Sequence, residues 1–322
     1  MQELRLDDLS ITSIGWAQAR HRTAFGSPSG DVIEFLSHAR LIEPFVVDEE
    51  NEPRYRVRLA ALILFGKQQP IAQHLSCFET ILTTSRGTVR LRKNLVETIR
   101  ELVLDDTALL RQHCPDVAVR TLQELLVNAY IHRCWRTAAP VVITISDDLT
   151  IQNPGGLLAG LSTGNLLYGI PQYRNFALAE AARFSGVCDK IGQGINIIFE
   201  TIISGGLPFP EFASDDDTFR AQIRMARSAD FAEFVRRRAT TLSNIDEIMA
   251  LRLCWDRDGR ISLREIRDGL QRDSRSTRLL LENMCKKNIL ESANGSEEFQ
   301  LTHSIRRDIA TVFSWDQYQL FQ

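Results

Sequence analysis

The sequence lacks the marks of several protein classes. None of its six cysteines forms a CxxC pair with another, which argues against a zinc site and against a disulfide framework. No apolar run approaches the roughly 18 residues that a membrane span needs, and the first ten residues contain no apolar stretch typical of a signal peptide. Because scattered free thiols suit a reducing compartment, the sequence predicts a cytoplasmic protein without membrane attachment.

The chain also lacks a basic excess and a P-loop. Its formal net charge is -3, so any DNA contact has to come from a local basic face. The pattern GxxxxGK[ST] is absent, since Gly66-Lys67 lacks the upstream glycine and is followed by Gln68. The sequence therefore predicts that this chain is not by itself a helicase motor.

What is present is an ordinary globular composition, with 44% hydrophobic and 25% charged residues over 322 positions. This length suits two or three domains, and the mixture of helical and strand patterns predicts an α+β fold. Apolar periodicity indicates a buried helix over 59–65, ended by Gly66 and Pro70, and an amphipathic helix over 117–133. A strand hairpin is expected over 141–152, and a closing strand over 219–225.

Glu124 and Asn128 are the residues in this pattern with the clearest chemical potential. They lie four apart, so on a helix they share one face. A carboxamide oxygen can hold Mg²⁺ and a nearby carboxylate can orient water. Two glycine clusters follow, one after the hairpin and one, Gly192-x-Gly194, before another helix. Glycine allows close backbone approach, and a helix N-terminus attracts phosphate, so this order of elements favours a nucleotide site.

The segment LQELLVNAYIHR (residues 122–133) resembles the N-box of GHKL ATPases, which have the Bergerat fold. More closely, it resembles the ATP-binding module labelled helicase RecG C-terminal-like, which usually follows an AlbA/Schlafen-type DNA-binding domain. The resemblance covers roughly residues 70–228 and rests on several motifs in order. These are Glu124, Asn128, Ala129, His132 and Arg133, then Asn153-Pro154-Gly155-Gly156, then Arg174-Asn175, then Gly192-Gln193-Gly194, then Gly206-Leu207-Pro208 and Thr218-Phe219-Arg220.

The resemblance implies ATP and Mg²⁺ as cofactors in a Bergerat α/β sandwich. It assigns Glu124 as general base and Asn128 as the Mg²⁺ ligand. Its nucleotide contacts would come from Asn128, Asn153, Gly155, Gly156, Arg174, Gly192, Gly194 and Thr218. In well-studied GHKL ATPases an Asp accepts a hydrogen bond from the adenine amino group, whereas the matching residue here is Asn153. An amide oxygen accepts that bond more weakly, so at most a weak ATPase is expected. His132, late in the helix, is more typical of a packed or hydrogen-bonded histidine than of a catalytic one.

The C-terminal region resembles a winged helix. Ser262 and Glu265 form a capping-box pattern, Asp273 and Ser274 cap a further helix, and Asn294-Gly295 predicts a hairpin turn. Arg275, Ser276 and Arg278 lie where a recognition helix would meet the DNA major groove. A small packing or dimerisation domain is the alternative, because this fold serves both uses.

A second motif overlaps this region. Residues 254–265 (CWDRDGRISLRE) mimic an EF-hand loop, but Cys254 stands where the first acidic ligand is needed. The other interpretation makes Asp258-Gly259 a turn before the first strand of the winged helix.

These patterns predict three parts: a mostly helical N-terminal segment over 1–70, a GHKL-like ATP-binding domain over 71–228, and a winged-helix domain over 229–322. A basic linker over 227–240 forms the first part of that last domain. The leading hypothesis is a DNA-associated, transcriptional regulator-like protein. In it, ATP orders residues 162–174 as a lid and so controls homodimerisation or the placement of the winged helix. The alternative is a non-catalytic interaction module that keeps the Bergerat sheet as a scaffold. The resemblance also leads us to expect a DNA-binding domain upstream of this chain or on a partner subunit.

Overall fold

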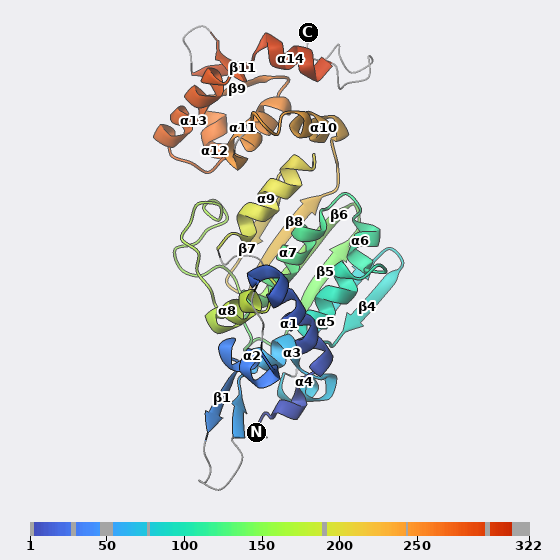
Figure 1. Cartoon of the computed structure of the whole chain (residues 1–322). Coiled ribbons are helices and arrows are strands. Elements are labelled where there is room, and N and C mark those ends of the chain that lie inside the picture. The colour runs from blue at the N-terminus through green and yellow to red at the C-terminus, as the bar shows by residue number, and fades with distance from the viewer. Residues whose placement is uncertain are drawn as a thin grey trace.

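The computed structural model describes residues 3–26, 30–45, 54–75, 78–188, 192–242, 244–293 and 297–310. The fold is α+β and is built around a mixed six-stranded sheet of order β4-β3-β5-β6-β8-β7 (Figure 1). Within these ranges, no helix combines the length and the apolar character that crossing a bilayer requires. The predicted Asn294-Gly295 turn and the tail from Trp315 lie outside the described residues.

The sheet has one buried face. Its strands are β3 (Thr80–Thr84), β4 (Gly87–Leu91), β5 (Val141–Ile145), β6 (Asp148–Pro154), β7 (Glu211–Ser214) and β8 (Thr218–Arg224). The pairing of β3 with β5 is parallel and the other pairings are antiparallel. Along β5, Val141, Ile143 and Ile145 are buried whereas Thr144 is exposed, which is the alternation expected for a sheet packed on one side.

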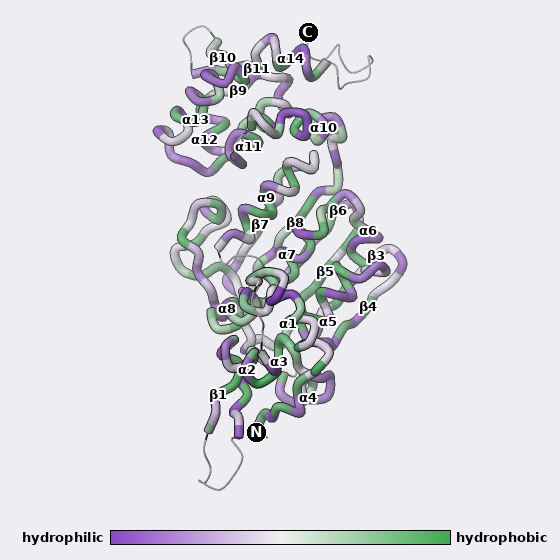
Figure 2. The backbone as a smooth tube through the Cα atoms, viewed as in Figure 1, coloured by the Kyte–Doolittle hydropathy of each residue, from purple (hydrophilic) through white to green (hydrophobic). Residues whose placement is uncertain are grey.

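Helices cover that buried face. They are α5 (Leu95–Ile99), which continues as a π-helical turn η2 (Arg100–Leu104), α6 (Leu109–His113), α7 (Val119–Ile131), α8 (Phe176–Phe184) and α9 (Gly194–Ser204). The predicted helix over 117–133 is confirmed as α7, which packs on β6 and runs beside α9. Figure 2 shows apolar segments concentrated in the sheet and in its covering helices.

The N-terminal segment is helical, with one hairpin that the sequence did not predict. It contains η1 (Leu6–Asp8), α1 (Ile11–Phe25), α2 (Val32–His38), β1 (Ile42–Phe45), β2 (Arg54–Val57), α3 (Leu59–Phe65) and α4 (Gln68–His74). The buried helix α3 is confirmed and ends before Gly66. Pro70 was wrongly expected to stop a helix, because it lies in the first turn of α4, where a missing N–H costs nothing.

The C-terminal region gathers at the opposite end of the molecule from the β1–β2 hairpin (Figure 1). It comprises α10 (Ala229–Arg237), α11 (Ile245–Trp255), β9 (Arg260–Ser262), α12 (Leu263–Gly269), α13 (Ser274–Lys286), β10 (Leu290–Ser292), β11 (Glu298–Leu301) and α14 (His303–Ala310). The expected linker is therefore partly helical, since α10 buries Phe231, Phe234 and Val235. Three strands form a small sheet of order β10-β11-β9; its assignment as a winged helix stays a prediction.

The structure favours the turn interpretation of the EF-hand-like segment. Asp258 and Gly259 have positive φ angles of 54° and 81°, and β9 begins at the next residue. Glu265, the expected twelfth-position ligand, instead completes the capping box with Ser262 and accepts a hydrogen bond from Arg257 at 3.0 Å. Its oxygens are therefore committed to local structure.

Candidate functional site

A cavity of about 150 Å³ lies between α7, α9, the sheet and a long connection before α8. We call residues 157–174, which form this connection, the cavity loop. The cavity lining includes all but one of the sequence-predicted nucleotide residues: Glu124, Asn128, Asn153, Gly155, Gly156, Arg174, Gly192 and Gly194. The structure thus brings together in one place residues that span 70 positions of sequence (194 minus 124).

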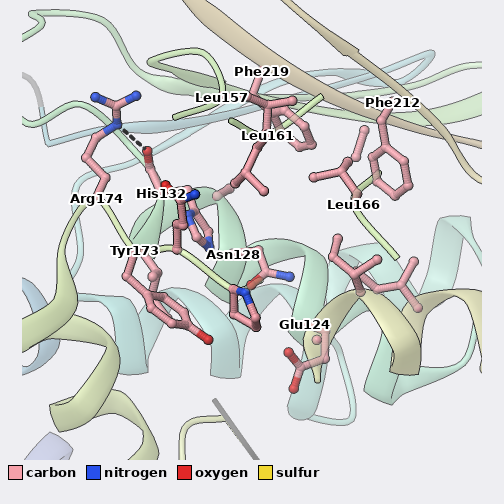
Figure 3. Close-up of a pocket in the computed structure, with 18 of the residues that line it drawn as sticks. Glu124, Asn128, His132, Leu157, Leu161, Leu166, Tyr173, Arg174, Phe212 and Phe219 are labelled. Carbon is pink, nitrogen blue, oxygen red and sulfur yellow. Dashed lines mark hydrogen bonds between the residues drawn. The ribbon is translucent and has the colours of Figure 1, made fainter. Parts of the chain in front are cut away.

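The first turn of α9 lies directly against Glu124 and Asn128. A Cβ atom added at Gly194 would lie 2.9 Å from Oε2 of Glu124 and 3.0 Å from Nδ2 of Asn128. Glu124 is 4% exposed, so its carboxylate is shielded from bulk solvent, and it lines the same cavity as Asn128 (Figure 3). The first N–H groups of a helix have no partners within the helix. The arrangement therefore places a carboxylate, a carboxamide and a helix N-terminus within reach of one small ligand.

The first glycine pair has a structural reason of its own. A Cβ at Gly156 would lie 1.7 Å from the carbonyl oxygen of Asp215, and one at Gly155 would lie 3.0 Å from Cβ of Cys134. Gly155 also has a φ of +96°, which favours glycine. These glycines were expected to admit a ligand. The geometry shows that Gly156 also admits the turn between β7 and β8, and that Gly155 admits Cys134.

Arg174 and Asn175 hold the C-terminal end of α7. The Arg174 guanidinium donates to the carbonyl of His132 at 3.1 Å and to that of Gly156 at 2.8 Å. Asn175 Nδ2 donates to the carbonyls of Ile131 at 2.7 Å and Arg133 at 2.8 Å. The carbonyls of Ile131, His132 and Arg133 lie at the C-terminal end of α7, where carbonyls have no intrahelical partner. Arg174, predicted to contact the nucleotide, therefore also fixes the cavity loop to α7.

Much of the cavity surface is apolar. Figure 3 shows Leu161 and Leu166 of the cavity loop between Phe212 and Phe219 of the sheet and the α7 side chains. The sequence did not point to Phe212, and Phe219 was named only as part of a motif and not as a cavity residue. The alternation along β8 offered a signal for Phe219, because it shares a sheet face with the buried Ala221 and Ile223.

Thr218 and Asn153 differ in how they relate to the cavity. The lining residues found in the described structure do not include Thr218, whose amide and hydroxyl donate to the Asp215 carboxylate at 2.6 and 3.1 Å. These bonds keep the pKa of Asp215 below its ordinary value and close the β7–β8 turn.

Asn153 is 3% exposed and its Nδ2 donates to the carbonyl of Pro154 at 3.2 Å. With Nδ2 engaged in this way, Oδ1 of Asn153 is the atom that can accept a hydrogen bond from a ligand.

His132 follows the last residue of α7 and lines the cavity next to the cavity loop. Its ring stacks on Tyr173 with centroids 5.6 Å apart. Burial, reinforced by the charge of Arg174, lowers its pKa to about 4. A neutral imidazole in this position fits the packing role weighed from the sequence.

We expect this histidine to make stability depend on pH. In the unfolded chain His132 titrates near 6.5, so protonation favours unfolding. The contribution of neutral His132 to the free energy of unfolding is complete above about pH 6.5 and is lost as the pH falls toward about 4. Urea unfolding should show a free energy of unfolding that falls less between pH 7 and 4.5 in His132→Gln than in the unmodified chain. The exposed His38→Gln is the control, and an unchanged pH slope in His132→Gln would refute this role.

No cluster of three or more histidine, cysteine or acidic side chains suited to a metal occurs in the described ranges. A site with one carboxylate and one carboxamide, Glu124 and Asn128, instead fits Mg²⁺, which keeps several waters and takes its other ligands from a substrate's phosphates.

Comparisons with known proteins are consistent with this geometry. Residues 138–223 match a family described as "Putative ATP-dependent DNA helicase recG C-terminal". The match begins between α7 and β5 and ends within β8, so it supports an ATPase-like module without testing Glu124 and Asn128, which lie on α7. No curated protein matches the chain.

The structure is similar to the crystal structure of the DIP2311 protein from Corynebacterium diphtheriae, with a TM-score of 0.72 and 19% sequence identity. The similarity covers 96% of this chain and 64% of that one. The chain therefore spans less than two thirds of the length of the protein whose fold it shares. This similarity shows that the two chains share a fold, and the family match supports an ATPase-like module over residues 138–223.

Proposed function

We propose that the chain binds Mg-ATP in the cavity between α7 and α9 and uses it to control a DNA-associated C-terminal domain. The observation that carries this proposal is the contact of the Gly194 end of α9 with Glu124 and Asn128. Anions bind at helix N-termini, and the adjacent carboxamide supplies an oxygen for the metal. The family match at residues 138–223 supports the same nucleotide, and the order of elements supports a GHKL-type domain.

Each residue has a role in this proposal. Asn128 Oδ1 ligates Mg²⁺, and the Gly192 and Gly194 backbone faces the phosphates. Asn153 Oδ1 accepts from the adenine amino group. Glu124 orients a water for attack on the terminal phosphate, which makes the chain a slow ATPase at most. Because most of the cavity surface is apolar, most of the specificity for the base falls on Asn153.

The test is calorimetric titration of the full chain with ATP and Mg²⁺. We expect binding that weakens about tenfold or more in Asn128→Ala, because the metal loses its protein ligand. Asn283→Ala removes the same group from the exposed side of α13 and is the matched control. Absence of binding of ATP or ADP at millimolar concentration, in the presence of Mg²⁺, would exclude the nucleotide role.

One observation favours the alternative of a non-catalytic scaffold. The Arg174 guanidinium, the cationic side chain of the described cavity lining, already donates to two protein carbonyls. If the cavity serves only as a scaffold, the double variant Glu124→Ala/Asn128→Ala should leave both oligomeric state and DNA affinity unchanged. A change in either property after ATP addition, lost in the double variant, supports the nucleotide role.

The DNA part of the proposal rests on the start of α13. Arg275 and Arg278 are exposed there, and Arg278 also pairs with Glu297 at 2.9 Å. We expect Arg275→Ala to weaken binding to duplex DNA roughly tenfold and to reduce the salt dependence of binding by about one ion. Fluorescence anisotropy measures both. Arg86→Ala, in the β3–β4 turn, is the control, and equal effects of the two substitutions would argue against a DNA surface on α13.

A further inference from the structure

The cavity loop reaches beyond the cavity and contacts the C-terminal region. The Tyr168 hydroxyl donates a short hydrogen bond to the carboxylate of Asp246, in the first turn of α11. The Arg272 guanidinium lies over the Tyr168 ring at 4.9 Å and pairs with Asp246 at 2.9 Å. One residue earlier, Gln271 Nε2 donates to the carbonyl of Thr163 at 3.2 Å. We call the cluster of Tyr168, Asp246 and Arg272 the latch.

The contacts within the latch are partly buried. The side chains of Asp246 and Arg272 are 16% and 25% exposed, so the ion pair is shielded from water and is stronger than a surface pair. Burial and the Asp246 carboxylate raise the pKa of Tyr168, which keeps its hydroxyl as a donor. Each of the three side chains thus contacts the other two.

The latch joins two functional surfaces. Within the same loop, Leu161 and Leu166 line the cavity. On the other side, Arg272 directly precedes Asp273, the N-cap of α13, and the proposed DNA-contacting residue Arg275 follows two positions later. A shift of the cavity loop therefore acts directly on the start of α13.

A second connection links the cavity to α11, the helix that carries Asp246 of the latch. α9 begins at the cavity with Gly194, and the carbonyls just after its end, those of Gly206 and Leu207, accept hydrogen bonds from Arg252 at 3.0 and 3.2 Å. Arg252 is 5% exposed and belongs to the last turn of α11. Both ends of α11 are therefore tied to elements that line the cavity.

We propose that the latch couples occupancy of the cavity to the position of α13. The inference rests on the proposed nucleotide site. An occupant that contacts Leu161 and Leu166 stabilises the cavity loop where it docks on α11, and the docked loop slows release of the occupant. Such coupling is reciprocal. If nucleotide changes the affinity of α13 for a ligand by some factor, that ligand has to change the affinity of the cavity for nucleotide by the same factor.

The test is hydrogen–deuterium exchange of the full chain, with Tyr168→Phe as the main variant. This change removes the hydroxyl and keeps the ring under Arg272. Without nucleotide, we expect exchange over residues 157–174 and 271–276 to be roughly fivefold faster, as loss of one hydrogen bond predicts. Tyr55→Phe, on β2, is the matched control. Asp246→Asn is the second variant, and circular dichroism checks that each variant is folded.

The second arm adds ATP and Mg²⁺. In the unmodified chain, protection should increase in the cavity loop and also over α11–α13. In Tyr168→Phe it should increase in the cavity loop alone, with faster nucleotide release. Equal protection of α11–α13 in both proteins overturns the latch. If ATP protects nothing, the proposed nucleotide function fails. The latch is then judged by the first arm, where unchanged exchange in both variants overturns it.

Discussion

Gly194→Ala is expected to weaken Mg-ATP binding by roughly tenfold or more while leaving the fold intact. The added Cβ would lie 2.9 Å from the Glu124 carboxylate and 3.0 Å from the Asn128 carboxamide. Both contacts are with the ends of flexible side chains, so the protein can relieve them by moving these groups. That movement displaces the groups proposed to hold metal and water, and small displacements of such groups are costly for function.

Gly15→Ala is the control for this experiment. Gly15 lies within α1, and a Cβ there would meet nothing within 4 Å. It should raise the free energy of unfolding by about 0.5–1 kcal/mol, the usual gain for alanine in a helix, and leave nucleotide affinity unchanged. Calorimetric titration measures the affinity. Unaltered affinity in Gly194→Ala would show that ATP does not use the N-terminus of α9.

Gly156→Ala should produce the largest loss of stability from a single methyl group. Its Cβ would lie 1.7 Å from the carbonyl oxygen of Asp215, a backbone atom that cannot rotate away. The backbone of β6 or of the β7–β8 turn has to shift, and such overpacking typically lowers the free energy of unfolding by about 1–3 kcal/mol. Urea denaturation checks the value.

A matched substitution is available in the cavity loop. Gly164→Ala would place its Cβ 3.8 Å from Oγ of Ser162, an ordinary contact, so its free energy of unfolding should stay within about 0.5 kcal/mol of the unmodified chain. Comparable losses in the two variants would mean that the glycine next to Asp215 is not required for packing.

Features of the fold that depend on local chemistry were predictable from the sequence. Asn94, a residue type that favours helix starts, caps α5 by accepting from the Glu97 amide at 2.9 Å. The capping box of Ser262 and Glu265 is present as predicted, and α12 begins at Leu263, directly after β9. The apolar periodicity of α7 located Glu124 and Asn128 on one helix face.

Features that depend on distant partners were not predictable. The strand β7 has mostly exposed residues and is defined by its pairing with β8. α10 was predicted to be a basic linker because arginines cluster at its C-terminal end. Its apolar face is recognised only in the fold, where Phe231 and Phe234 pack near Trp255. The contact of Tyr168 with Asp246 joins residues 78 apart, and no periodicity in the sequence reports on it.

A crystal structure of the full chain with a non-hydrolysable ATP analogue and Mg²⁺ would show directly where a nucleotide binds. We expect the metal at about 2.1 Å from Oδ1 of Asn128, the phosphates at the Gly194 end of α9, and the base beside Asn153. An analogue bound elsewhere, or a cavity without it at saturating concentration, would exclude the proposed nucleotide site.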